Sequence, residues 1–296
     1  MEFQTSPEVA RAIKEGGPIV ALESTIIAHG LPRPSNFEVA QEVEAIVRAE
    51  GATPATIAMI DGRIHIGLDE KQLSDLATRD DITKASTRDL PILIAAKRSA
   101  ATTVASTAYL AWRAGISTFA TGGLGGVHRG AAESFDESAD LTALSRIPIT
   151  VVCAGVKSIL DVPATLERLE TLGISLIGYR TDRFPGFYLR DSGFALEYRI
   201  DSTDEIASIM RSRTHEAALI VAQAANHPMD AQLHQGLLDE GLRRAHEQGI
   251  SGKAVTPFLL EFFHHESGGE SLRVNTEIIK ENSKLAAQIA VSFSRS

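Results

Sequence analysis

Cysteine is almost absent from the sequence, and long apolar runs are absent altogether. Cys153 is the single cysteine among 296 residues, so no disulfide framework can form, and its apolar surroundings indicate a small buried hydrophobe in a reducing compartment. No segment reaches about 18 uninterrupted apolar residues, and the first 25 residues lack the basic start and apolar stretch of a secretory signal. These features predict a cytoplasmic protein without a membrane partner.

Basic residues are in deficit. The chain has 29 Lys and Arg against 38 Asp and Glu, a net charge of -9 at pH 7, and no dense basic stripe. Nucleic-acid binding depends on basic side chains that displace counterions from phosphates, so this composition argues against a nucleic-acid partner. A small phosphorylated ligand is compatible with it, because one lysine and a few backbone N–H groups can hold a phosphate.

Short β-branched runs alternate with amphipathic segments along the chain. Apolar runs predict strands at residues 18–22, 55–60, 117–123, 149–155, 174–179 and 217–223. Several of these runs are apolar throughout, which is typical of strands covered on both faces. Helical spacing predicts helices at residues 36–51, 101–115, 163–173, 203–214, 230–249 and 271–293.

This alternation predicts an α/β fold in which a largely parallel sheet lies between two helical layers, a three-layer α/β/α sandwich. Residues 61–69 and 193–202 instead alternate polar and apolar positions, which predicts antiparallel pairing at an edge and hence a mixed sheet. No linker, repeat or low-complexity tract divides the chain, so we expect one domain over residues 1–296.

Two charged residues follow predicted strands, where open parallel sheets bind their ligands. Glu23 directly follows the first run; a half-dry carboxyl group there can act as a general acid or base, or simply cap a turn. Lys157 follows the run at 149–155 among apolar neighbours. Such neighbours lower the pKa of a lysine, and a neutral amine forms Schiff bases with carbonyl carbons, whereas an ordinary lysine would extend to solvent.

The segment TGGLGGVHRG, at residues 121–130, places four glycines in five positions. Glycines let successive backbone N–H groups point into one concavity, so Thr121, Gly122 and His128 are candidates to bind an anionic substrate. A mobile surface loop is the alternative. The pattern is neither a Rossmann fingerprint nor a Walker loop.

The acidic segment FDESAD, at residues 135–140, offers carboxylates for a metal ion. Mg²⁺ and Mn²⁺ bind one or two carboxylates plus waters, so a single-carboxylate site is compatible with this segment, and a solvated acidic loop is the alternative. Lys84 is a further candidate for the site. His264 and His265 are interpreted as surface residues, because no third metal ligand is spaced to suit them.

Six long motifs together closely resemble the pseudouridine-5′-phosphate glycosidase family, which includes the indigoidine-synthesis A proteins. The motifs are ALESTIIAHGLPRPSN (21–36), PATIAMIDG (54–62), TTVASTA (102–108), FATGGLGGVHRG (119–130), FDESADL (135–141) and VVCAGVKSILD (151–161). The resemblance implies a three-layer α/β/α fold, a homotrimer and a divalent metal, usually Mn²⁺. The implied reaction, of the carbon–oxygen lyase (hydro-lyase) class, is reversible cleavage of the C–C glycosidic bond of pseudouridine 5′-phosphate to uracil and ribose 5-phosphate.

Residue roles follow from this resemblance. Lys157 would be the nucleophile that forms an imine with C1′ of the ring-opened sugar, Glu23 the proton donor, and Asp136 the metal ligand. The implied substrate contacts are Lys84, Val104, Ser138, Ala139 and Asp140.

The chain departs from the family at Ala222, Gln223 and Ala224, where relatives have an Asn-Pro-rich turn. In the C-terminal segment, we expect Asn275 or Asn282 to reach the site.

Two other functions are compatible with these residues. A Schiff-base aldolase acting on a sugar phosphate would share Lys157 and Glu23 but would need no metal, so loss of activity on chelation would speak against it. A family member that binds a metabolite without catalysis would have no physical need for Lys157, Glu23 and Asp136 together.

Overall fold

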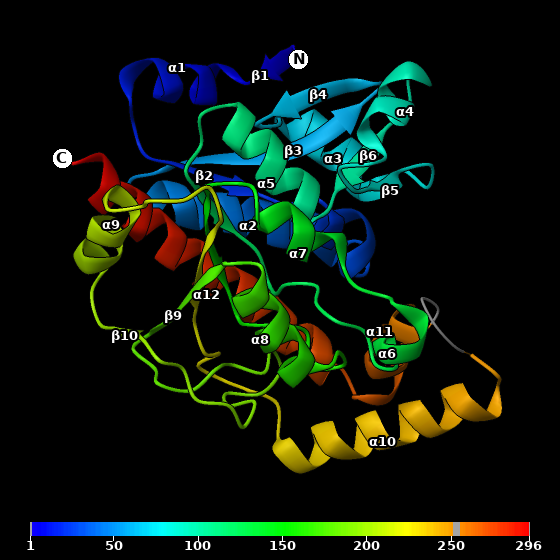
Figure 1. Cartoon of the computed structure of the whole chain (residues 1–296). Coiled ribbons are helices and arrows are strands. Elements are labelled where there is room, and N and C mark those ends of the chain that lie inside the picture. The colour runs from blue at the N-terminus through cyan, green and yellow to red at the C-terminus, as the bar shows by residue number, and fades with distance from the viewer. Residues whose placement is uncertain (1, 251–254, 296) are drawn as a thin grey trace.

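The computed structural model describes residues 2–250 and 255–295, and an 11-stranded sheet forms its centre (Figure 1). The main path of the sheet runs in the order β1-β4-β3-β2-β7-β8-β11-β9-β10, with β6 pairing β3 and β5 off this path. The strands are β1 (Phe3–Thr5), β2 (Ile19–Leu22), β3 (Thr53–Ile60), β4 (Arg63–Ile66), β5 (Thr83–Ala85), β6 (Ala100–Thr102), β7 (Thr118–Ala120), β8 (Thr150–Cys153), β9 (Ser175–Tyr179), β10 (Arg199–Ile200) and β11 (Leu219–Ala222).

Helices follow most strands, as the alternation of the sequence predicts. They are α1 (Pro7–Glu15), the π-helix η1 (Ile26–Gly30), α2 (Ser35–Ala49), α3 (Glu70–Thr78), α4 (Leu90–Ala95), α5 (Val104–Arg113), α6 (Ala131–Ser134), α7 (Ala139–Leu144), α8 (Val162–Thr171), α9 (Thr203–Arg211), α10 (Ala231–Glu247), α11 (Val255–Glu266) and α12 (Glu270–Ser294). Each predicted strand and helix is present. The helix predicted at 101–115 begins too early, however, because residues 100–102 form β6 against β3 and β5.

The two faces of the sheet pack against separate helical layers, which confirms the α/β/α sandwich. In β2, Ile19 and Ala21 belong to a core shared with α1, α5, α8 and α10, whereas Val20 and Leu22 pack with α2, α9 and α12. All four residues of β2 are therefore buried, as are those of β8 and β11. This two-sided burial is the physical reason for the continuously apolar runs in the sequence.

The sheet is mixed, as predicted, but one edge differs from the prediction. β4 pairs antiparallel to β3, with Ile57 opposite Ile66, and β6 also pairs antiparallel to β3. The predicted antiparallel pairing within 193–202 is limited to an isolated bridge at Ala195, because β10, at the end of this segment, runs parallel to β9. The connecting loop doubles back through an antiparallel bridge between Arg183 and Ala195 before the chain enters β10. Polar/apolar alternation reports one-sided burial of a strand, which is commoner in antiparallel sheets but does not by itself fix the pairing direction.

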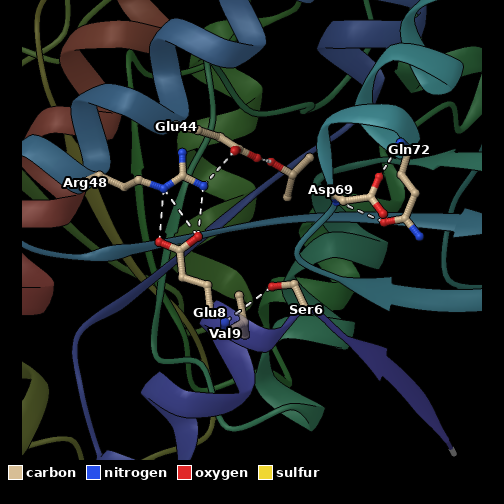
Figure 2. Close-up of polar contacts among 8 residues, drawn as sticks. Ser6, Glu8, Val9, Glu44, Arg48, Asp69 and Gln72 are labelled. Atoms are coloured by element: carbon tan, nitrogen blue, oxygen red, sulfur yellow. Dashed lines mark hydrogen bonds and ion pairs between the residues drawn. The ribbon is translucent and has the colours of Figure 1, made fainter.

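Polar contacts between helices and strands fix the N-terminal half of the sandwich (Figure 2). Glu44 of α2 accepts a hydrogen bond of 2.7 Å from the hydroxyl of Thr56 on β3, and Arg48 bridges Glu44 and Glu8 of α1. Burial raises the pKa of Glu44, against the opposing effects of Thr56 and Arg48. At the start of α3, Asp69 and Gln72 form a reciprocal capping box, which satisfies two backbone N–H groups.

Cys153 is buried at the end of β8, and burial raises the pKa of its thiol to about 12. This confirms its interpretation as a small hydrophobe. Over residues 2–250 and 255–295, none of the helices is both long enough and apolar enough to cross a bilayer.

Candidate functional site

A cavity of about 680 Å³, partly open to solvent, lies at the carboxyl ends of the central strands. β2, β7 and β8 are successive parallel neighbours, so the residues that follow them meet at one edge of the sheet. The lining residues are Glu23, Thr25, Ile26, His29, Gly30, Lys84, Gly122, Gly123, Lys157, Phe187, Tyr188, Leu260, His264 and Asn275. Five of the residues that the sequence marked as site candidates are therefore brought together: Glu23, Lys84, Gly122, Lys157 and Asn275.

The carboxylate of Glu23 is held between two hydroxyl groups. Thr25 donates to one of its oxygens and Thr121, which follows β7, donates to the other. The Thr25 hydroxyl also lies 3.1 Å from the carbonyl oxygen of Thr102, at the end of β6. These contacts fix the plane of the carboxylate in the cavity wall, so Thr121 acts on the site through Glu23.

Lys157 enters the cavity from a turn that follows β8. Its backbone N–H donates to the carbonyl of Leu124 at 3.2 Å, and its own carbonyl accepts from the N–H of Leu160 at 2.9 Å. Both ends of the residue are therefore anchored, and its half-buried side chain lines the cavity.

Lys84 projects from β5 into the same cavity, where part of its side chain stays exposed to solvent. Burial lowers its pKa most, and the positive charge of Lys157 lowers it further, whereas Glu23 and Asp140 oppose the shift. Three charged groups from β5 and from the ends of β2 and β8 thus interact electrostatically within one site. Burial and, secondarily, the charge of Lys84 also lower the pKa of His29 in η1.

The glycine-rich segment is a packed part of the site, unlike the mobile surface loop considered above. A Cβ atom at Gly123 would lie 2.5 Å from the Phe187 ring, and one at Gly125 would lie 2.7 Å from a carboxylate oxygen of Asp140. The N–H of Gly125 donates to Asp140 and that of Val127 to Thr165, both at 2.9 Å. The glycines here therefore permit close approach of neighbouring side chains, and two of the N–H groups considered for an anion are already occupied.

The residues implied as substrate contacts on α5 and α7 lie beside the cavity and outside its lining. Asp140 accepts hydrogen bonds from the N–H groups of Ala105, at 3.0 Å, and Gly125. Ser138 caps α7, and Val104 at the start of α5 is buried in the core. Ala139, the first residue of α7, is exposed. Their roles as substrate contacts stay predictions.

The carboxylate of Asp136 is a candidate ligand for a hard cation. One oxygen of its carboxylate is buried without a hydrogen-bond partner among the described residues, and it lies 3.6 Å from Nδ1 of His128. The pKa of His128 is lowered mainly by burial, which Asp136 opposes and Lys157 reinforces. Over the described ranges, no cluster of three or more His, Cys, Asp or Glu side chains could hold a metal ion. One carboxylate completed by waters is a common arrangement for Mg²⁺ and compatible with Mn²⁺.

Sequence reasoning missed several residues of the cavity wall. His264 was interpreted as a surface residue, but it is half-buried and lines the cavity from α11, whereas His265 is exposed. The lining residue Phe187 lies in the long loop after β9, and His29 lies in the π-helix; no spacing in the sequence marked them. π-Helical turns are frequent at functional sites, but their local sequence does not distinguish them.

The two asparagines of α12 both reach this region. Asn275 lines the cavity, and Asn282 lies behind it, donating to the carbonyl oxygen of Thr121 at 2.8 Å. The divergent segment at Ala222, Gln223 and Ala224 does not line the cavity. Ala222 ends β11, and the other two residues line a separate groove with Arg180 and Lys284.

Comparisons with known proteins agree with this geometry. The family described as "Indigoidine synthase A like protein" matches residues 8–292. The chain is 56% identical over 291 residues to a pseudouridine-5′-phosphate glycosidase of Salinispora tropica, covering 96% of this chain and 90% of that relative. It is 54% identical to a protein of the same name from Frankia alni, covering 97% of this chain and 81% of that relative.

Two solved structures have the same fold. The prealnumycin C-glycosynthase AlnA, in complex with ribulose 5-phosphate, superposes with a TM-score of 0.92 at 32% identity, over 99% of this chain and 97% of that chain. An indigoidine synthase A-like protein from Thermotoga maritima superposes with a TM-score of 0.89 at 37% identity, with the same coverage of both chains. The chain therefore belongs to the indigoidine synthase A-like family, together with the pseudouridine-5′-phosphate glycosidases.

Proposed function

We propose that the protein is a pseudouridine-5′-phosphate glycosidase, which reversibly cleaves pseudouridine 5′-phosphate to uracil and ribose 5-phosphate. The observation that carries this proposal is the meeting of Lys157, Glu23 and Lys84 in one cavity at the carboxyl edge of the sheet. The names of the relatives, and the sugar phosphate bound to the C-glycosynthase, support the same substrate class.

A lysine suits this reaction because a C-glycoside has no oxygen or nitrogen leaving atom for a two-carboxylate mechanism to protonate. The neutral amine of Lys157 bonds to C1′ while the C1′–O4′ bond opens and O4′ takes up a proton. Glu23 then gives a proton to C5 of the uracil ring. The C1′–C5 bond breaks as the electron pair of the lysine nitrogen forms the C1′=N imine, and water hydrolyses this imine to ribose 5-phosphate and the free amine.

The remaining residues bind and orient the substrate in this proposal. Thr25 and Thr121 hold the plane of the Glu23 carboxylate, so that its proton is directed at one atom of the base. Substrate contacts are proposed for residues at and beside the cavity: Lys84, Val104, Thr121, Gly122, His128, Ser138, Ala139 and Asp140. The family resemblance implies the contacts on α5 and α7, whereas Lys84 and Gly122 are also supported by their place in the cavity wall.

Mn²⁺, or another divalent cation, is the proposed cofactor, held by Asp136 and water. The buried carboxylate oxygen without a partner supports this assignment, because such an oxygen is costly unless it binds a cation or a donor. When bound, the cation supplies positive charge that orients and neutralises oxygen groups of the substrate.

In the synthetic direction, the oxygen on C1′ of ribose 5-phosphate leaves as water, so we place the enzyme in the carbon–oxygen lyase class, as a hydro-lyase. We also propose a cytoplasmic homotrimer in which residues 1–296 form one domain. Light scattering tests the assembly: a particle of three times the 31.7 kDa chain mass supports it, and a monomer contradicts it.

Product formation tests the proposed reaction. Purified protein is incubated with uracil, ribose 5-phosphate and Mn²⁺, and pseudouridine 5′-phosphate is quantified by chromatography. Parent protein and a control, Lys71→Ala at an exposed lysine of α3, are expected to form it at equal rates. Lys157→Ala is expected to lose at least about 10³-fold in rate, because it removes the nucleophile. A folded, Mn²⁺-loaded parent protein that forms no product contradicts the proposal.

A further inference from the structure

A buried polar pair beside Lys157 has no part in the mechanism described above. Nε2 of His234, on α10, lies 2.7 Å from the hydroxyl oxygen of Ser158, the residue that directly follows Lys157. Only 3% of His234 and 6% of Ser158 is exposed. The two residues are 76 positions apart in the chain, so this contact joins α10, at the lower edge of Figure 1, to the turn that carries the lysine.

Aromatic rings fix the orientation of the His234 ring. It packs edge-on against Phe263 of α11, with ring centroids 5.4 Å apart, and lies 6.4 Å from Tyr188. Tyr188 in turn stacks on Phe263 and lines the cavity. Burial, with a smaller contribution from the positive charge of Arg129, lowers the pKa of His234 to about 4. The ring is therefore neutral near pH 7, and it faces the Ser158 hydroxyl in a fixed orientation.

The turn from Lys157 to Leu160 is held from two sides. On the sheet side, the backbone N–H of Lys157 donates to Leu124, and Nε of Arg129 donates to the carbonyl oxygen of Ile159 at 2.9 Å. On the side of α10, the Ser158 side chain of the turn forms its hydrogen bond with His234. Loss of that bond would free the turn to rotate about its sheet-side anchors, and the lysine side chain would move with it.

We propose that His234 is a positioning residue, which acts through Ser158 to aim the amine of Lys157 at the sugar carbon. The inference rests on the proposed function, since it takes Lys157 to be the nucleophile. A displacement of about 1 Å at a reacting group can cost about 10²-fold in rate, so a single hydrogen bond in the supporting turn has a large effect on catalysis. It has a small effect on substrate affinity, which depends on other residues of the cavity.

The test compares Ser158→Ala, His234→Phe and the double variant. His234→Phe keeps an aromatic ring against Phe263, and Ser158→Ala removes the same bond by deleting one oxygen atom. The measured quantities are the KM for ribose 5-phosphate, the kcat for product formation, and the rate at which borohydride traps the sugar phosphate on the protein. His246→Gln, at an exposed histidine of the same helix, is the control.

We expect each single variant to lose about 10- to 100-fold in kcat and in trapping rate, with a KM within about threefold of the parent value. The double variant should lose no more activity than the more impaired of the two single variants, because both changes break the same hydrogen bond. His234→Gln, whose side-chain nitrogen can approximate Nε2, should recover at least about tenfold relative to His234→Phe. A role in stability alone would leave kcat per folded molecule unchanged.

Three results would overturn this inference. The first is an equal rate of borohydride trapping for the parent protein and for Ser158→Ala, a substitution that changes little volume. Another is multiplication of the two single losses in the double variant, because the residues would then act independently. The third is a failure of His234→Gln to improve on His234→Phe. A folded parent protein that is not trapped at all contradicts the proposed function itself, so the two failures are distinguishable.

Discussion

Asp140→Asn tests how the site is built around the carboxylate that joins α5, α7 and the glycine-rich segment. Both oxygens of Asp140 accept backbone hydrogen bonds, from Ala105 at 3.0 Å and Gly125 at 2.9 Å, and only 8% of the residue is exposed. The substitution is nearly isosteric, so it changes the hydrogen bonding and the charge while the packing stays the same.

The expected loss can be worked from these contacts. Hydrogen bonds to a charged acceptor are worth about 1.5–3 kcal/mol each, and an amide retains one acceptor oxygen. The amide NH₂ group then faces a backbone N–H that is left buried without an acceptor, at a further cost of about 1 kcal/mol. We therefore expect Asp140→Asn to lower the free energy of unfolding by about 2–4 kcal/mol and the Tm by about 4–8 °C.

Urea denaturation followed by circular dichroism measures this loss. Asp80→Asn is the matched control, because that side chain is 93% exposed and its ion pair with Arg33 contributes at most about 1 kcal/mol. Asp140→Asn should also lower kcat, since Asp140 holds the loop that carries Gly122. A variant within about 0.5 kcal/mol of the parent protein would refute the reasoning that this carboxylate fixes two backbone segments.

Three further predictions concern the cavity, the metal and the pH. Gly123→Ala should abolish most activity and shift the Phe187 ring, because the new Cβ would lie 2.5 Å from it; a crystal structure of the variant with Phe187 in place would contradict this. Chelation by EDTA should reduce product formation in the parent protein, and added Mn²⁺ should restore it. Calorimetric titration should detect Mn²⁺ binding to the parent protein and none to Asp136→Ala; equal binding to both proteins would contradict this. The pKa of His234 is lowered from 6.5 to about 4, so its stabilising effect is complete above pH 6.5 and is lost as the pH falls towards 4, by about 3 kcal/mol in total. Urea titrations from pH 7 to 4.5 should therefore show that the free energy of unfolding falls less steeply with pH in His234→Phe than in the parent protein. The same pH dependence in both proteins would contradict a lowered pKa of His234.

The sandwich was predictable because burial on both faces leaves a clear pattern in the sequence. Runs such as residues 149–155 are apolar at every position, and strands of this kind in α/β proteins are parallel and central. The ends of β2 and β8 then place Glu23 and Lys157 at one edge. Edge elements were harder to predict, since a two-residue strand such as β10 has too few residues to form a pattern that indicates its pairing direction.

The cavity wall was less predictable, because tertiary packing selects its members. His264, Phe187 and His29 come from a helix, a long loop and the π-helix, and they share no local pattern. The glycine-rich segment shows a related limit. Its glycines suggested an anion site, whereas those at Gly123 and Gly125 are required by close approach of Phe187, Ser138 and Asp140. A cluster of glycines reveals that something comes near the backbone, and the sequence does not say what.

Trapping of the covalent intermediate tests the central claim most directly. The protein is incubated with ribose 5-phosphate, reduced with borohydride, digested and mapped by mass spectrometry, with Lys157→Ala and the Lys71→Ala control treated alike. The account predicts a reduced sugar-phosphate adduct on the peptide that contains Lys157, present in the Lys71→Ala protein and absent from the Lys157→Ala protein. An adduct on Lys84 instead of Lys157, or none on a folded and active parent protein, would contradict it.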